Sequence, residues 1–155
     1  MNMRASRIPK TRSSPSTFKR ILVPVDLTRK SKPALEVALK LAIQNDALVT
    51  LLHVIERVDH ITSKEMDVFY KKLEKKARHR MNTCAKLFHD EGMKVDQMIT
   101  YGKRTREIVK FAMNKKIDLI VLSSHRVDPD EPRPNFGTIS YAVGILSQCP
   151  VLLVK

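Results

Sequence analysis

Several residue types are scarce in this 155-residue sequence, and each scarcity excludes a class of protein. There is no tryptophan, and there are only four glycines and two cysteines. Cys84 and Cys149 are too few for a disulfide-stapled fold, so we expect free thiols in a reducing compartment. No apolar run approaches the ~20 residues that span a bilayer. We therefore expect a cytoplasmic protein that has no membrane partner.

Acidic residues are also scarce, with 16 Asp and Glu against 29 Lys and Arg, which gives a formal net charge of +13. This surplus attracts polyanions nonspecifically and has no bearing on the fold. Residues 1–17 contain four basic residues and no acidic one. We expect a disordered basic tail over 1–17 and a single domain over 18–155.

The order of apolar segments predicts the fold class. From residue 19 onward, short apolar runs alternate with segments of helical period, as in parallel strands joined by right-handed helical crossovers. The run at 95–101 alternates polar and apolar residues, which is typical of a half-exposed edge strand. The prediction is an α/β fold: a single doubly wound five-stranded parallel sheet in the order 3-2-1-4-5, with helices on both faces. The expected strands are 21–25, 48–54, 95–101, 118–123 and 151–154.

Helix boundaries follow from capping residues. Ser31 is the expected N-cap of the first helix, and Thr62 with Glu65 has the spacing of a capping box for the second. Gly92 is the expected end of that second helix. Its buried line is expected to be Met66, Phe69, Leu73, Ala77, Met81, Cys84 and Phe88.

A ligand crevice is expected where the first and fourth strands end. In this strand order their following helices go to opposite faces, which opens a crevice at the carboxyl ends of the strands. Free N–H groups at the start of the last helix, with the Thr138 hydroxyl, would form an anion site there. Asp26 is alternatively a turn former, and Gly137 with Thr138 is alternatively a turn and cap. The residues expected at the crevice are Asp26, Ser123, Ser124, His125, Arg126, Gly137 and Thr138.

A set of separated motifs resembles the universal stress protein family. They are Pro24-Val25-Asp26, Leu51-Leu52-His53-Val54, Gly102 with Ile108, 118–121, Ser124-His125, and Gly137-Thr138 before Cys149-Pro150-Val151. The resemblance implies a homodimer paired through the last strand and no established catalytic cycle. Some family members bind ATP. An apolar edge strand would otherwise invite aggregation, so we expect Val151, Leu152, Leu153 and Val154 at the dimer interface.

The resemblance is incomplete in the phosphate-binding motif. ATP-binding members carry G-x-x-G-x9-G-[ST], whereas this sequence has Ser123 and Arg126 at the first two glycines and a ten-residue spacer, 127–136. Arg126 is expected to replace the lost N–H contacts with a bidentate phosphate grip. The resemblance also implies that Asp26 and Val49 contact the adenosine, with Val25 beside them. The cofactor, if one is bound, is expected to be ATP or ADP with Mg²⁺.

Three functions are compatible with these features. The leading hypothesis is a noncatalytic stress-response regulatory protein with a divergent nucleotide-binding crevice, because strong enzyme signatures such as G-x-S-x-G are absent. The first alternative is an ATP-binding member that hydrolyses ATP slowly, with Mg²⁺ held by the acidic loop around Asp128. The second is a nucleic-acid-associated module that uses the tail and the basic run 71–80. We expect that run to be a solvated face without stacking aromatics, and we expect no histidine metal site.

Overall fold

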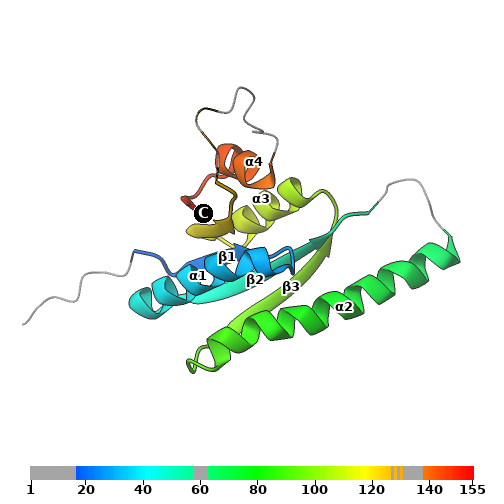
Figure 1. Ribbon diagram of the computed structural model, residues 1–155, viewed down its shortest axis with the longest axis horizontal. Coiled ribbons are helices and arrows are strands. Elements are labelled where there is room, and N and C mark those ends of the chain that lie inside the picture. Colours follow the sequence, from blue (N-terminus) through cyan, green and yellow to red (C-terminus); the bar gives the residue numbers. More distant parts are fainter. Residues whose placement is uncertain (1–16, 58–62, 127, 129, 131–137) are drawn as a thin grey trace, which may run out of the picture.

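Five parallel strands form one sheet in the order β3-β2-β1-β4-β5 (Figure 1). The computed structural model describes residues 17–57, 63–126, 128, 130 and 138–155. The predicted fold class and strand order are confirmed. The expected tail lies outside the described residues except for Thr17 and stays a prediction. The strands are β1 (Arg20–Pro24), β2 (Leu48–Ile55), β3 (Val95–Tyr101), β4 (Leu119–Ser123) and β5 (Val151–Val154).

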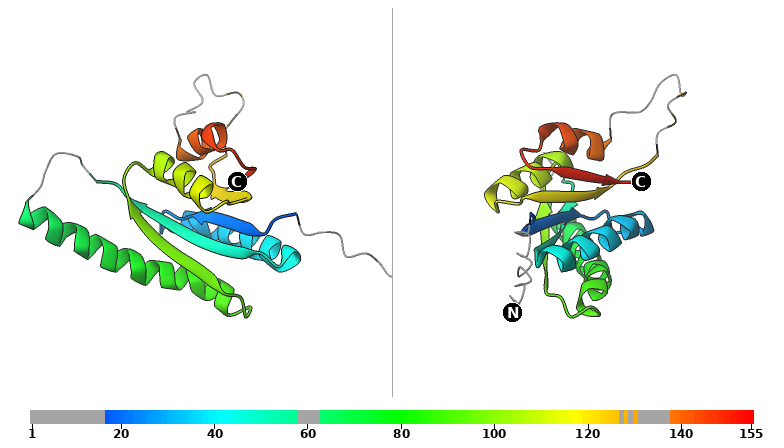
Figure 2. Two further views of the ribbon diagram at one scale, coloured as in Figure 1. Left: turned by 180° about the vertical axis from the view of Figure 1, so that it is seen from behind. Right: turned by 90° about the vertical axis from the view of Figure 1, so that its left-hand side faces the viewer.

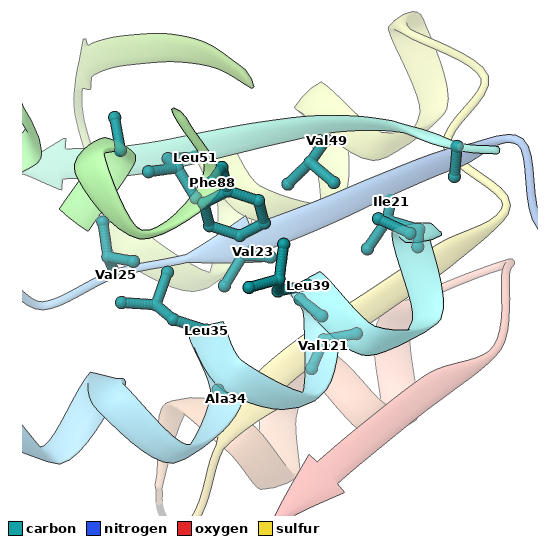
Figure 3. Packing of buried hydrophobic residues seen from close by; sticks show 14 of the residues in the cluster. Ile21, Val23, Val25, Ala34, Leu35, Leu39, Val49, Leu51, Phe88 and Val121 are labelled. Atoms are coloured by element: carbon teal, nitrogen blue, oxygen red, sulfur yellow. The ribbon is translucent and has the colours of Figure 1, made fainter. Parts of the chain in front are cut away.

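The helices cover both faces of the sheet, as predicted (Figure 2). Helices α1 (Lys32–Asn45) and α2 (Lys64–His89) pack on one face, and α3 (Arg104–Asn114) and α4 (Ile139–Leu146) on the other. Because successive strand residues point to opposite faces, Ile21 and Val23 join the core under α1 and α2, whereas Leu22 joins the core under α3 and α4. Figure 3 shows the ring of Phe88 from α2 close to Val23 and Leu51.

Helix α2 presents a different aromatic residue to the core from the one predicted. Tyr70 is buried, whereas Phe69, which was expected in the buried line, is 51% exposed. The Tyr70 ring packs edge-on against Tyr101, and the guanidinium of Arg57 lies about 5 Å from the centre of each ring. These contacts from the ends of β2 and β3 select Tyr70 as the inward residue.

The predicted N-cap of α1 is confirmed in position, and the N-cap of α2 lies one residue later than predicted. The Ser63 hydroxyl accepts a hydrogen bond from the Met66 N–H at 3.2 Å and caps α2, while Thr62 lies outside the described residues. Ser31 makes no side-chain cap for α1; a short 3-10 turn, η1 (Arg29–Ser31), precedes the helix, and Thr28 caps that turn. The Ser31 hydroxyl is therefore available for a different partner.

Several smaller predictions are confirmed. Gly92 follows the end of α2 with φ of +71°, a conformation that glycine adopts without strain. Cys84 and Cys149 are free thiols. Strands β3 and β5 lie at the two edges of the sheet, and every second residue in the first half of β3 is exposed.

Candidate functional site

A cavity of about 150 Å³ lies at the carboxyl ends of β1, β2 and β4. We call it the crevice cavity. It occupies the position that the strand order predicted, between β1 and β4 and under the start of α4. Its apolar lining comes mainly from strands β2 and β4 and from helices α3 and α4. The principal apolar residues are Leu52, Val54, Ile108, Leu122 and Ile139.

Asp26 stands at the edge of this cavity with one carboxylate oxygen already in use. Its Oδ1 accepts hydrogen bonds from the Thr28 N–H and hydroxyl, both at 2.8 Å, and from the Ser31 hydroxyl at 2.7 Å. Partial burial works to raise the pKa of Asp26, but these hydrogen bonds and the charge of Lys30 together lower it. The carboxylate is therefore ionised at neutral pH. It is a turn former through Oδ1, while Oδ2 has no hydrogen-bond partner among the described residues.

His53 contributes a hydrogen-bond acceptor that the sequence analysis did not place in the site. Its Nδ1 lies 2.8 Å from the backbone carbonyl oxygen of Val25, so Nδ1 carries the proton. In the neutral ring, Nε2 is then an acceptor, and it has no hydrogen-bond partner within the described part of the chain. Because the half-buried ring lines the cavity, Nε2 is available to a ligand donor group.

The serine residues after β4 have separate roles. Ser123 lines the crevice cavity, and its Oγ is buried with no hydrogen-bond partner among the residues described. Ser124 does not line it; its hydroxyl lies 3.2 Å from that of Ser140 and accepts from the Lys155 ammonium at 3.2 Å. Of the two, Ser123 has the hydroxyl that no other group of the described residues uses.

The start of α4 is a helix cap. The Thr138 hydroxyl accepts a hydrogen bond from the Tyr141 N–H at 3.3 Å and lies 3.1 Å from the Ser140 hydroxyl. Of the two roles considered for Thr138, an anion site or a helix cap, its hydroxyl has the role of a cap. Gly137 lies outside the described residues, as does most of the spacer that follows β4.

Five of the predicted site residues that the structure describes do not line the crevice cavity: Ser124, His125, Thr138, Val49 and Arg126. Val49 pairs with Ile21 at the amino end of the strands and is 1% exposed in the core, because it is the second residue of β2. Val54, near the carboxyl end of β2, lines the cavity in its place. Arg126 is exposed and lines neither this cavity nor those beside it. Val25, in contrast, lines the cavity as expected.

Two further cavities adjoin the first. A cavity of about 340 Å³, which we call the α2-side cavity, shares Asp26, His53, Val54 and Arg104 with the crevice cavity and adds Lys76 and Arg80 from α2. An open groove between α3 and α4, the α3–α4 groove, also reaches Arg104. Arg104 was not among the predicted site residues, because the crevice was predicted from the ends of β1 and β4. The signal was present: β3 ends at Tyr101, so residues just after it lie at the same edge of the sheet.

The described residues contain no group of three or more His, Cys, Asp or Glu side chains placed to hold a metal ion. Likewise, no helix in the described part of the chain is long and apolar enough to cross a membrane.

The basic run on α2 is exposed, as predicted, but an aromatic ring lies beside it. Phe69 is 51% exposed next to Lys71 and Lys72. A stacking surface for single-stranded nucleic acid uses several aromatic rings along a groove. One ring is not such a surface, so we do not propose nucleic acid as a partner.

The fold and the crevice define a doubly wound α/β domain of the kind that binds ligands where the strand order reverses. Comparison with known proteins identifies the family. The model of the universal stress protein family matches residues 17–155, and the chain belongs to that family.

Similar proteins come from bacteria and archaea. Universal stress protein YxiE of Bacillus subtilis is 26% identical over 148 residues, covering 89% of this chain and 99% of YxiE. The solved structure of MJ0577 is 28% identical, with a TM-score of 0.74 over 90% of this chain and 96% of that one. MJ0577 is a universal stress protein of Methanocaldococcus jannaschii.

Two structures with the same fold were solved with nucleotides. One is a universal stress protein in complex with cAMP, with a TM-score of 0.65, 18% identity, and coverage of 90% of this chain and 99% of that one. The other, from Archaeoglobus fulgidus, is in complex with dAMP, with a TM-score of 0.67 and the same identity and coverage.

Proposed function

We propose that this protein is a noncatalytic stress-response regulator that binds an adenine nucleotide in the crevice cavity and acts as a homodimer. The observation that carries the proposal is the combination in one cavity of an apolar lining with unused polar groups. These groups are Asp26 Oδ2 and His53 Nε2, both of which accept hydrogen bonds, and Ser123 lines the same cavity. The cAMP and dAMP complexes of two proteins with this fold support the choice of an adenine nucleotide.

A nucleoside matches this lining chemically. The apolar side chains of Val54, Ile108 and Leu122 suit the faces of a purine ring, since ligand pockets are mostly apolar with a few placed polar groups. An ionised carboxylate accepts hydrogen bonds from vicinal ribose hydroxyls, and Asp26 Oδ2 is free to do so. In this proposal Val54 takes the adenosine-contacting role that the resemblance suggested for Val49.

Thermal unfolding with and without nucleotide tests the proposal. A ligand at 100 times its Kd adds about 2.7 kcal/mol, which raises the Tm of a domain of this size by roughly 5–10 °C. We expect this rise with AMP, cAMP or ATP. The variant Ser123→Leu, which places a larger side chain in the wall of the cavity, should lose the rise, while overpacking by about 1–3 kcal/mol lowers its unliganded Tm by about 2–12 °C. No rise with any of these nucleotides at millimolar concentration contradicts nucleotide binding.

Phosphate release separates the noncatalytic proposal from slow hydrolysis. With Mg²⁺ and ATP we expect no release above that of the buffer over hours. Release that disappears in the Ser123→Leu variant would establish hydrolysis in this crevice and would replace the noncatalytic part of the proposal.

The dimer is proposed to form through β5. Leu152 in this edge strand is 38% exposed, and Ile145 and Leu146 on the neighbouring α4 are 67% and 58% exposed. Pairing with a second copy would satisfy the strand edge and cover this apolar surface. We expect Leu152→Lys to be a monomer in sedimentation analysis. Met98→Lys is the matched control, because Met98 is 43% exposed on the opposite edge strand, β3. A wild-type monomer, or a dimer that survives Leu152→Lys, contradicts this interface.

A further inference from the structure

Arg104 lies where all three cavities meet. It is the first residue of α3 and lines the crevice cavity, the α2-side cavity and the α3–α4 groove. It is one helical turn before Ile108, which lines the apolar part of the crevice cavity. A guanidinium at this position is within reach of a ligand whose base packs on Ile108.

The side chain of Arg104 is held only loosely. Its Nε lies 3.7 Å from Oε2 of Glu56, and the two side chains are 46% and 55% exposed. An exposed ion pair of this kind contributes little, about 0–1 kcal/mol. The other guanidinium N–H groups have no hydrogen-bond acceptor among the described residues. Glu56 therefore marks a place where an anionic oxygen approaches Arg104, and a more strongly bound anion would displace it.

Further cations face the same space from α2. Lys76 and Arg80 line the α2-side cavity; Arg80 Nη1 donates to the Leu27 carbonyl at 3.4 Å, and Lys76 has no ion-pair partner in the described part of the chain. The carboxylates of Asp26 and Glu56 and the ring of His53 face this cavity as well. With Arg104, three cations against two carboxylates leave the α2-side cavity positive.

The opposite side of the crevice offers less to an anion. The hydroxyls of Ser124 and Thr138 are already bonded within the protein. Arg126, which the sequence analysis expected to grip phosphate, lines none of the three cavities. The described cations that line the crevice cavity and the α2-side cavity thus belong to α3 and α2.

We propose that Arg104 binds the phosphate of an adenine nucleotide in the α2-side cavity, displacing Glu56, in the field of Lys76 and Arg80. This inference rests on the proposed function and adds the location of the anion subsite. A guanidinium pairs with phosphate through two parallel charge-assisted hydrogen bonds, which is a stronger contact than the loose pair with Glu56. The base lies in the crevice cavity, and the ribose lies at Asp26, where the two cavities join.

Calorimetric titration of full-length protein with adenosine and with AMP tests this subsite. Arg104→Met should weaken AMP binding about 10-fold, the equivalent of one charge-assisted contact, and leave adenosine within about 2-fold of wild type. Arg106→Met is the matched control on the same helix, because Arg106 lines the α3–α4 groove but neither of the other two cavities. It should leave both ligands unchanged. Glu56→Gln should act in the opposite direction and strengthen AMP binding by about 2- to 5-fold, since it frees Arg104.

Specific outcomes overturn the inference. Equal losses for adenosine and AMP in Arg104→Met would mean that the side chain stacks on the base. A loss of AMP affinity in Arg126→Met, with none in Arg104→Met, would place the phosphate after β4. If wild type binds adenosine and AMP with equal affinity, the subsite is absent while the proposed function stands. If it binds neither, both fail.

Discussion

Replacing Asp26 with alanine removes the acceptor that organises the turn between β1 and α1. Three donors, from Thr28 and Ser31, converge on its Oδ1. Thr28 is exposed, so its two donors can turn to water at a cost of a few tenths of a kcal/mol each. Ser31 is 2% exposed, so its hydroxyl would stay buried without an acceptor, at a cost of about 1–3 kcal/mol.

Together these losses predict that Asp26→Ala lowers the free energy of unfolding by about 2–3 kcal/mol, or about 4–12 °C in Tm. Urea denaturation at neutral pH measures it. Glu36→Ala is the control, because Glu36 forms only an exposed pair with Lys32 at 3.7 Å and should change stability by less than about 0.5 kcal/mol.

The pH dependence of this difference has a definite sign. Because the folded state lowers the pKa of Asp26 from its ordinary value of 3.8, the carboxylate stabilises the fold fully above that value. This stabilisation is lost as the pH falls through the lower folded-state pKa. Wild type and Asp26→Ala should therefore converge in stability as the pH falls below 3.8. A difference below about 0.5 kcal/mol at neutral pH, or one that grows on acidification, would refute this account of the turn.

Two further predictions use matched pairs of substitutions in thermal or urea unfolding. Phe88→Ala should cost about 3–5 kcal/mol because the ring is fully buried, whereas Phe69→Ala should cost less than about 1 kcal/mol; equal costs would contradict the orientation of α2. Gly102→Ala should destabilise by about 1–3 kcal/mol, because φ is +140° and a Cβ would lie 2.9 Å from Glu107 Cγ. Gly144→Ala, in α4 with open space around it, should stabilise by about 0.5–1 kcal/mol; the reverse order would contradict these backbone assignments.

The strand order was predictable because it depends on local patterns. Buried central strands are continuous apolar runs, such as Ile21 to Val25, whereas an edge strand alternates, as at 95–101. Asp26 was found in the same way, since the residue after a central strand must lie at the carboxyl edge of the sheet. The features that depend on one segment alone, namely the strands and the residue that follows a central strand, were therefore predicted correctly.

The errors concern contacts between segments. Helical periodicity does not decide between the adjacent rings of Phe69 and Tyr70; the choice depends on Arg57 and Tyr101, which are distant in the sequence. Val49 was predicted to contact the adenosine from its motif position alone, although the second residue of β2 lies at the amino end of the sheet.

The roles of two residues at the site, Ser31 and Arg104, also depend on contacts between segments and could not be predicted from local sequence. Ser31 has the sequence position of a helix cap, but its hydroxyl is used by Asp26. Arg104 is one of many cations in a basic sequence, and only the packing of α3 against the sheet distinguishes it from Arg106. Such selection among equivalent residues requires the tertiary structure.

A crystal structure of the protein with AMP tests the central claim most directly. We expect the base against Ile108 and Val54, ribose hydroxyls within hydrogen-bond distance of Asp26 Oδ2, and the phosphate on the guanidinium of Arg104. Nucleotide density elsewhere on the molecule, or an empty crevice at saturating AMP, would contradict it.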